Sequence, residues 1–247
     1  MPWSDGLIMT YTELFFAVKN YLQNDFPSNT WTNVAGTSTT TSTGTEQINT
    51  FITQAEERIY NSVQIPPLRK NVTGLTTISN KYLSCPADFM SVFSMAVIDA
   101  TGAYEYLLNK DVNYIRAAYP SPTATGLPQY YALFGPTVAS SVITDELSFI
   151  LGPTPDAAYN VELHYYAYPE SITVAADGRT WLGDNYSPVL LYGTMVEAYI
   201  FLKGETDLMA VYEKKYMDAM AQLNRLGSGL ERGDAYRDGQ YKMKVGP

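Results

Sequence analysis

The chain has 247 residues, of which 46% are hydrophobic and 17% are charged, and its formal net charge at pH 7 is −9. This length favours two domains, and this composition is typical of a globular protein with a substantial core. The negative charge argues against tight binding to nucleic acid, because affinity for phosphates depends on Lys and Arg. The single cysteine, Cys85, excludes an internal disulfide framework.

Targeting and membrane signals are absent from the sequence pattern. The first residues, MPWSDGLIMTYTE, contain neither a basic leader nor an apolar segment typical of a secretory signal. The most apolar stretch, residues 189–202, is interrupted by Gly193 and Glu197 and is shorter than the ~20 residues that a bilayer span requires. We therefore expect a soluble protein with no membrane span.

Two helices are predicted in the N-terminal part. Thr10 with Glu13, and Thr43 with Glu46, have the S/T-x-x-E spacing of a capping box. The first helix is expected over residues 11–23, and the second is expected to end before Pro66 and Pro67. The second helix has one apolar face, formed by Ile48, Phe51, Ile52, Ala55, Ile59 and Val63. Residues 26–45, between the helices, have no apolar period and predict an exposed Thr-rich loop.

The middle of the chain changes to short runs rich in Val, Ile, Tyr and Phe, separated by turn residues. This pattern predicts a mainly antiparallel β domain with one short helix at 109–118. In the last strand Val161, Leu163, Tyr165 and Ala167 share one face, which predicts a one-sided core. The clearest strands are predicted at 91–98, 130–134, 146–151 and 159–168.

Two further helices are predicted near the C-terminus. Ser187-Pro188 is a typical helix start and Gly204 a typical end, and the helix between them is apolar nearly all round, as buried helices are. The next helix is expected over 206–226 and to end at Gly227. We expect both to pack with the N-terminal helices, with these core residues: Phe51, Ile59, Leu191, Tyr199, Tyr212 and Leu223.

The predicted fold class is therefore α+β: a helical bundle built from N- and C-terminal helix pairs, with an inserted mainly antiparallel β domain and an extended C-terminal arm. The expected domains are 1–65 for the first helices and Thr-rich loop, 66–184 for the β domain, 185–227 for the last helices, and 228–247 for the arm. The arm is rich in glycine and has too few apolar residues to form a core.

Candidate catalytic residues are few. His164, the only histidine, has no identifiable Ser or Cys partner, and we interpret it as an exposed strand residue and Cys85 as a small structural residue. Asp177 and Asp184 lack the spacing of a metal site, although a hydrolase that pairs them on folding stays a minor alternative. We expect no catalytic residues, no bound metal and no cofactor.

Two observations concern contacts. Glu56 and Glu57 are adjacent on a helix and point about 100° apart, so they form no carboxylate pair; we expect Glu57 in solvent and Glu56, with Arg58, in contacts at the domain boundary. The chain also has 21 tyrosines, which fit either an interface or a Tyr-rich β core, and composition does not decide between them.

The chain contains these phrases, in this order: AEERIYNSVQIPPLRKNVTG, NKYLSCPADF, LLNKDVNYIRAAYP, LGPTPDAAYNVELHYYAYPESI, TWLGDNYSPVLLYG and GDAYRDG. Together they resemble the head-to-tail adaptor proteins of short-tailed bacteriophages, also called tail tubular protein A-like. The resemblance extends from about Thr10 to the C-terminus.

The resemblance implies a structural virion protein of the tail or neck, made in the host cytoplasm, with no catalysis and no cofactor. It implies a ring, twelve-membered in this family, that joins the portal protein to the tail nozzle, with tail fibres as further candidate partners. Genomic DNA would pass through without tight binding. The alternative from another class is a carbohydrate- or peptide-binding module that uses β-domain aromatics.

The arm is the candidate portal-binding segment. Its glycines favour mobility, and Tyr236, Arg237, Tyr241 and Lys242 provide anchors of the kinds that dominate protein interfaces. The alternative is a frayed terminus, which is common in any protein.

Overall fold

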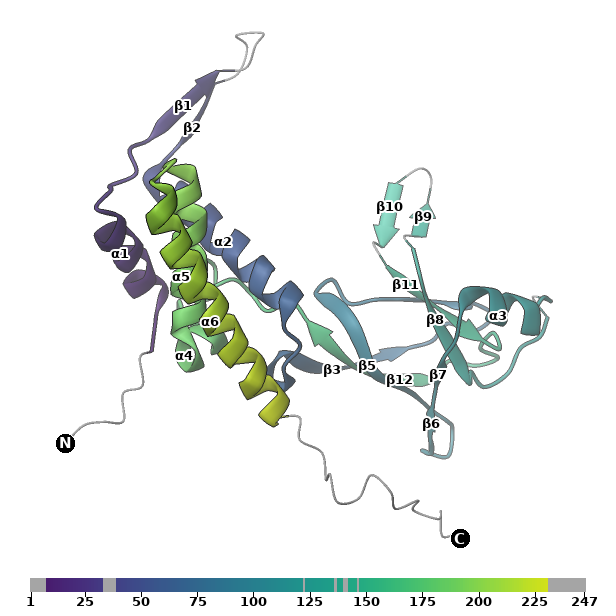
Figure 1. The fold of residues 1–247 in the computed structure, drawn as a ribbon. Helices are drawn as coiled ribbons and strands as arrows, with labels where there is room; N and C mark the ends of the chain where they lie inside the picture. Colours follow the sequence, from purple (N-terminus) through teal and green to yellow (C-terminus); the bar gives the residue numbers. More distant parts are fainter. Residues whose placement is uncertain are drawn as a thin grey trace. The chain divides into compact units, whose positions relative to one another are not determined.

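The structure is a computed structural model, and it describes residues 8–32, 39–121, 123–135, 137–139, 142–145 and 147–230. It divides into two compact units (Figure 1). The helical unit takes the chain up to Pro67 and again from Pro169, and the β unit comprises Leu68–Tyr168. The class is α+β, with antiparallel sheets, as the sequence predicts.

The helical unit is organised around one apolar helix, α5 (Ser187–Phe201). Helices α1 (Tyr11–Leu22), α2 (Gly44–Ser62), α4 (Trp181–Asn185) and α6 (Thr206–Leu230) all contact α5 (Figure 1). The side chains that α5 buries lie on several sides of the helix: Val189, Leu190, Thr194, Met195, Val196 and Ala198. The prediction that this helix is buried among others is confirmed.

Local sequence determines where α1 and α2 begin. The Thr10 Oγ1 accepts a hydrogen bond from the Glu13 N–H, and the Glu13 carboxylate accepts one from the Thr10 N–H at 2.8 Å. Thr43 and Glu46 form the same capping box at α2. Both predicted capping boxes are confirmed. Each one satisfies backbone N–H donors that the first turn of a helix leaves unpaired.

The apolar face of α2 is buried as its spacing predicts, with Ile48, Phe51, Ile52, Ala55 and Ile59 all inside the helical unit. Of the other residues predicted for the core, Leu223 is buried, whereas Leu191, Tyr199 and Tyr212 are only partly buried. The rings of Tyr199 and Tyr212 pack edge to face, with centroids 5.7 Å apart.

Gly227 does not end α6, which continues to Leu230, so the predicted helix end is wrong. A Cβ at Gly227 would lie 2.5 Å from the Cγ2 of Ile65, so glycine is required there for close packing of α6 against the chain after α2. The predicted arm, 228–247, accordingly begins within this helix, and residues 231–247 lie outside the described part.

The Thr-rich segment was predicted to be a loop, and this prediction is wrong. The segment contains an antiparallel hairpin of β1 (Asn29–Thr32) and β2 (Thr39–Ser42). Thr30 and Thr41 approach to 3.1 Å through their hydroxyls, and Thr32 and Thr39 to 3.3 Å. β-Branched residues favour extended backbone even where no apolar alternation reveals a strand. The described residues of the hairpin are largely exposed, which agrees with the predicted exposure.

The β unit contains two four-stranded sheets, in the orders β3-β12-β5-β6 and β4-β11-β8-β7. All pairs are antiparallel except β7 with β8. A small hairpin, β9 with β10, and one helix, α3, complete the described elements. Their bounds are β3 (Arg69–Leu75), β4 (Tyr82–Ser84), β5 (Phe89–Ile98), β6 (Tyr104–Tyr106), β7 (Leu108–Asn109), α3 (Val112–Ala118), β8 (Tyr130–Phe134), β9 (Thr137–Ala139), β10 (Val142–Asp145), β11 (Ser148–Gly152) and β12 (Asn160–Ala167).

The two sheets share one core. Side chains from both contribute to it, among them Met95 and Leu163 from one sheet and Phe149 and Leu151 from the other. The predicted inward face of β12 is confirmed. However, Tyr166 on the opposite face is also buried, because the guanidinium of Arg69 donates a 2.6 Å hydrogen bond to its hydroxyl and lies over its ring. The prediction of a strictly one-sided core is therefore wrong at this residue.

The β unit ends at Tyr168, earlier than the predicted boundary at 184. Residues 169–184 lie in the helical unit, where Ile172 is fully buried and the Met9 N–H bonds to the Gly183 carbonyl. The turn-rich composition of this segment resembles that of the β unit, but its few apolar side chains pack within the helical unit.

Close packing at Gly193 predicts a selective effect of substitution. A Cβ there would lie 3.2 Å from the Tyr216 ring and 3.3 Å from the Ala55 Cβ, whereas a Cβ at Gly229 would meet nothing within 4 Å. We expect Gly193→Val to lower the free energy of unfolding by about 1–3 kcal/mol through overpacking. Gly229→Val, also in a helix, should be neutral or slightly stabilising. Urea unfolding followed by circular dichroism measures both, and equal effects would contradict the packing of α2, α5 and α6.

Candidate interaction surfaces

The residues considered for catalysis lie in both units: His164 and Cys85 in the β unit, and Asp177 and Asp184 in the helical unit. His164 lies on β12, partly exposed, with its Nε2 3.2 Å from Glu162 Oε1, and the Asn71 amide donates to the same oxygen at 2.7 Å. Within the described residues no serine or cysteine bonds to this imidazole. Cys85 packs against the edge of the β core. Both positions agree with structural interpretations.

Asp177 and Asp184 both bond to Arg179, but through different groups. The backbone N–H of Arg179 donates to Asp177 Oδ1 at 3.1 Å, and its side-chain Nε donates to Asp184 Oδ1 at 3.0 Å. Asp177 is therefore engaged in a local turn, and Asp184 in an ion pair with the guanidinium. Across the described ranges, no three His, Cys, Asp or Glu side chains gather as a metal site would require.

Glu56 is the one strongly buried carboxyl described, with 3% of its surface exposed. Its Oε1 accepts a 3.0 Å hydrogen bond from the Ile172 N–H, and its Oε2 has no hydrogen-bond partner among the described residues. Burial raises the pKa of the Glu56 carboxyl, against the opposing effects of the Ile172 N–H and the nearby Ser171 hydroxyl. Glu56 therefore holds the segment after Tyr168 against α2.

The predicted role of Glu56 and Arg58 at the domain boundary is wrong for both residues. Glu56 lies inside the helical unit, because its position on α2 shares the buried face with Ile52 and Ile59. Arg58 pairs with Glu197 of α5 at 3.3 Å, and its guanidinium lies 4.7 Å from the centroid of the Tyr216 ring. Glu57 is exposed, as predicted.

An open groove of about 400 Å³ lies in the helical unit between α2 and α5. Its apolar floor is formed by Phe51, Ile200 and Phe201, and the rings of Phe51 and Phe201 lie 5.2 Å apart. Polar side chains at its margins are Ser42, Gln47, Thr50, Gln54 and Glu197. Half of the surface of Ile200 and Phe201 is exposed, an arrangement typical of a binding surface.

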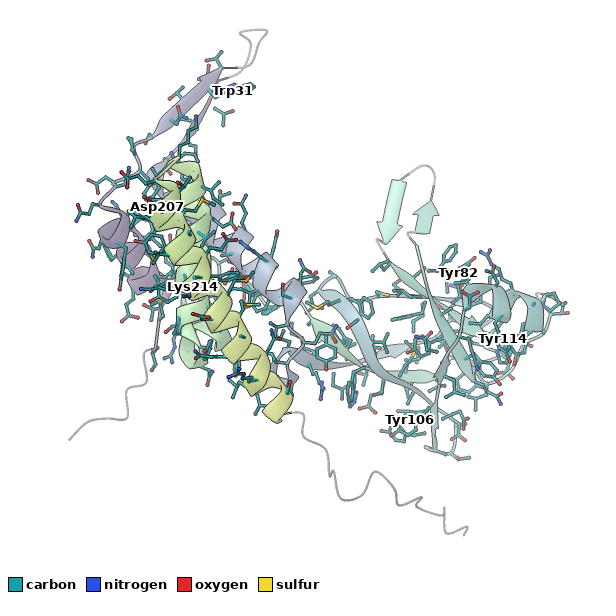
Figure 2. The ribbon with its side chains drawn as sticks, in the orientation of Figure 1. Trp31, Tyr82, Tyr106, Tyr114, Asp207 and Lys214 are labelled. Atoms are coloured by element: carbon teal, nitrogen blue, oxygen red, sulfur yellow. The ribbon has the colours of Figure 1, made fainter. Side chains whose placement is uncertain are left out.

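The hairpin, whose residue Ser42 lines this groove, exposes a tryptophan side chain. Trp31 is 62% exposed on β1 and stands opposite Thr40 of β2 (Figure 2). Its neighbours Thr30 and Thr32 bond across the other face of the hairpin. The sequence contained one clue to this surface: a tryptophan in a stretch with no charged residue between Phe26 and Thr45.

The β unit has a different exposed surface, formed by tyrosines. Tyr106 on the edge strand β6 is 66% exposed (Figure 2). Tyr104 on the same strand is 51% exposed, and the two rings are stacked with their centroids 6.4 Å apart. The strand register places Tyr106 in one row with Ala96 and Glu162, on the face that also bears His164. The tyrosines thus serve both as core, at Tyr131 and Tyr165, and as exposed surface.

The portal-binding residues predicted in the arm, Tyr236, Arg237, Tyr241 and Lys242, lie outside the described residues. None of the helices in the described part of the chain is both long enough and apolar enough to cross a lipid bilayer.

Two folded units with exposed apolar and aromatic surfaces define a structural interaction protein. The family model described as SU10 adaptor protein matches residues 9–240, so the chain belongs to that family and is a bacteriophage adaptor. The sequence resemblance to phage head-to-tail adaptors is confirmed. Membership implies a structural role in the neck or tail of the virion, with portal and tail proteins as partners. A search of curated proteins gives no match.

The buried Glu56 predicts a pH-dependent stability. Its pKa in the folded protein is raised above the ordinary value of 4.5 that applies to the unfolded chain. The free energy of unfolding therefore decreases as pH rises above 4.5, because the unfolded chain ionises first, and this loss is absent below pH 4.5. Glu56→Gln keeps an acceptor for the Ile172 N–H and carries no charge. The stability of this variant relative to the unchanged chain should therefore increase between pH about 4 and about 8, measured by thermal unfolding.

Two variants control this measurement. Glu57→Gln removes an exposed carboxyl on the same helix and should show no such trend. Glu56→Ala leaves the buried Ile172 N–H without an acceptor and should cost about 1–3 kcal/mol at either pH. A pH-independent difference for Glu56→Gln would contradict the burial of this carboxyl.

Proposed function

We propose that this protein is a head-to-tail adaptor whose copies form a ring between the portal and the tail nozzle and provide part of the DNA channel. The observation that carries the proposal is the match of the adaptor family over residues 9–240. A twelve-membered ring is the form that the resemblance implies, with tail fibres as additional candidate partners. The protein would be made in the host cytoplasm and act without catalysis or a cofactor.

The geometry supports this function in two ways. Helices α1, α2, α4 and α6 contact one apolar helix, α5, so helices from both ends of the chain meet in one folded unit. Each unit also exposes apolar or aromatic side chains, Trp31 and Phe201 in the helical unit and Tyr106 in the β unit. Such surfaces suit simultaneous contacts with several proteins.

The charge of the chain supports passage of DNA without capture. At a net charge of −9 many copies in one ring would repel phosphates, and few cations are available to release counterions. DNA would therefore pass along the ring without being bound tightly.

The C-terminal arm is the proposed portal-binding segment, with Tyr236, Arg237, Tyr241 and Lys242 as its anchors. Aromatic and arginine side chains dominate binding energies at protein interfaces. The described part of α6 extends to Leu230, so residues 231–247 of the arm can be removed without cutting it.

Deletion of residues 231–247 tests this segment. We expect the truncated chain to keep the melting temperature of the full chain and to lose capture by portal particles in a co-sedimentation assay. The full chain with Tyr236→Ala and Tyr241→Ala together should weaken capture by at least about tenfold. Retained capture by the truncated chain would place portal binding on the helices or the hairpin instead.

A second candidate function is saccharide binding by the β unit. The exposed stacked rings of Tyr104 and Tyr106 lie on one sheet face with Glu162, His164 and Asn71, which bond to one another. An aromatic platform beside several polar groups is a combination that can orient a small polar ligand.

A glycan array measures this second function. Binding of any saccharide should be lost in Tyr106→Ala, whose side chain is largely exposed, and kept in Tyr114→Ala, an exposed tyrosine on α3. An array without any binding would leave the tyrosines of β6 as a protein contact surface.

A further inference from the structure

The groove between α2 and α5 and the Trp31 side chain have complementary properties. The groove has an apolar floor of Phe51, Ile200 and Phe201, and at about 400 Å³ it falls within the range of roughly 300–1,000 Å³ for sites that hold a small organic group. An indole is apolar and flat, and it carries one N–H donor. Glu197 and Gln54, at the margin of the groove, present oxygens that can accept it.

Trp31 is held away from the groove of its own chain. The buried Gln47 amide donates to the Pro27 carbonyl at 3.1 Å and to the Ser42 carbonyl at 3.3 Å, so the chain just before β1 and the last residue of β2 are both bonded to α2. A Cβ at Gly44 would lie 2.1 Å from the Phe26 carbonyl oxygen, which shows how closely the chain crosses itself there. With its base anchored, the hairpin keeps Trp31 exposed and outside the groove lining.

The occupant that we infer is a second copy of this chain, because the chain itself exposes an indole and because both surfaces are free of unpaired charge. Two copies that each carry −9 repel each other, so a contact between copies must use neutral surfaces. The stretch between Phe26 and Thr45 contains no charged residue, and the one acidic residue of the groove, Glu197, is paired with Arg58. The hairpin of one copy can therefore approach the groove of another without repulsion.

We propose that the groove between α2 and α5 receives the Trp31 side chain of a second copy of this chain, so that each hairpin joins one copy to the next. The Trp31 side chain and the groove are different surfaces of one chain. The contact between copies is therefore heterologous, and heterologous contacts are the kind from which rings are built. This inference rests on the proposed ring function.

The size of the contact explains how it would operate. A tryptophan buries about 150–250 Å², whereas a stable interface buries about 1,200–2,000 Å² in total. A free pair of copies is therefore held weakly. On a portal that already holds many copies, the high effective concentration would make the same contact effective. Weak association before docking would prevent premature rings.

Sedimentation equilibrium of the full chain over a range of concentrations tests the proposal. We expect concentration-dependent association of the unchanged chain and at least about tenfold weaker association for Trp31→Ala. Thr50→Trp, which places an indole in the groove from an exposed position of α2, should weaken association equally. Trp31→Phe should fall between Trp31→Ala and the unchanged chain.

Matched controls accompany both variants. Tyr21→Ala removes another exposed aromatic of the helical unit, and Ser62→Trp adds an indole elsewhere on α2. Ser62, like Thr50, donates its hydroxyl to the carbonyl four residues earlier, so both substitutions remove the same kind of bond. Both controls should associate as the unchanged chain does.

The decisive experiment is a mixture of the Trp31→Ala and Thr50→Trp variants. Each variant keeps the surface that the other lacks, so the mixture should form pairs at concentrations at which each variant alone associates at least about tenfold more weakly than the unchanged chain. The proposal is overturned if Trp31→Ala associates normally, if the mixture stays monomeric, or if the unchanged chain is monomeric at every concentration. It is also overturned if both variants lower the melting temperature without changing the mass, which would indicate that Trp31 docks within its own chain.

The readouts separate this inference from the proposed function. Failure of the unchanged chain to bind portal particles would contradict the adaptor function. Normal portal binding with an unaffected Trp31→Ala assembly would contradict only the contact proposed for Trp31.

Discussion

The burial of α5 is the interaction on which the helical unit depends. Its apolar side chains need partners on several sides, and those partners come from both ends of the chain, at α1, α2, α4 and α6. Gly193 allows α2 and α6 to approach α5 closely, since its missing side chain leaves room for Ala55 and the Tyr216 ring. The β unit, Leu68–Tyr168, is therefore an insertion whose two ends both return to one helical core.

Buried polar side chains hold two irregular segments that the apolar core does not position. Glu56 bonds the segment that follows the β unit through the Ile172 N–H, and Gln47 bonds the two ends of the hairpin region at Pro27 and Ser42. Such buried polar groups contribute specificity more than stability, because each must be desolvated to make its bond. These contacts set the position of exposed side chains such as Trp31, and an adaptor binds its partners through exposed side chains.

Features that depend on nearby residues were predictable. The capping boxes of Thr10 and Thr43, the buried face of α2 and the inward face of β12 follow from spacing within one element. The hairpin escaped prediction because its threonines bond across strands without an apolar alternation. Gly227 was misinterpreted because a glycine that ends a helix and one that admits a neighbour look alike in sequence.

By itself, the sequence determined the fold class, most helices and strands, the family resemblance and the absence of an obvious catalytic motif. These follow from local periodicity, composition and ordered phrases. Only the tertiary structure decided that Asp184 pairs with Arg179, that Glu56 is buried within the helices, and that a groove forms between α2 and α5. The physical reason is that burial and grooves depend on which distant side chains meet, and periodicity within one element carries no information about its partners.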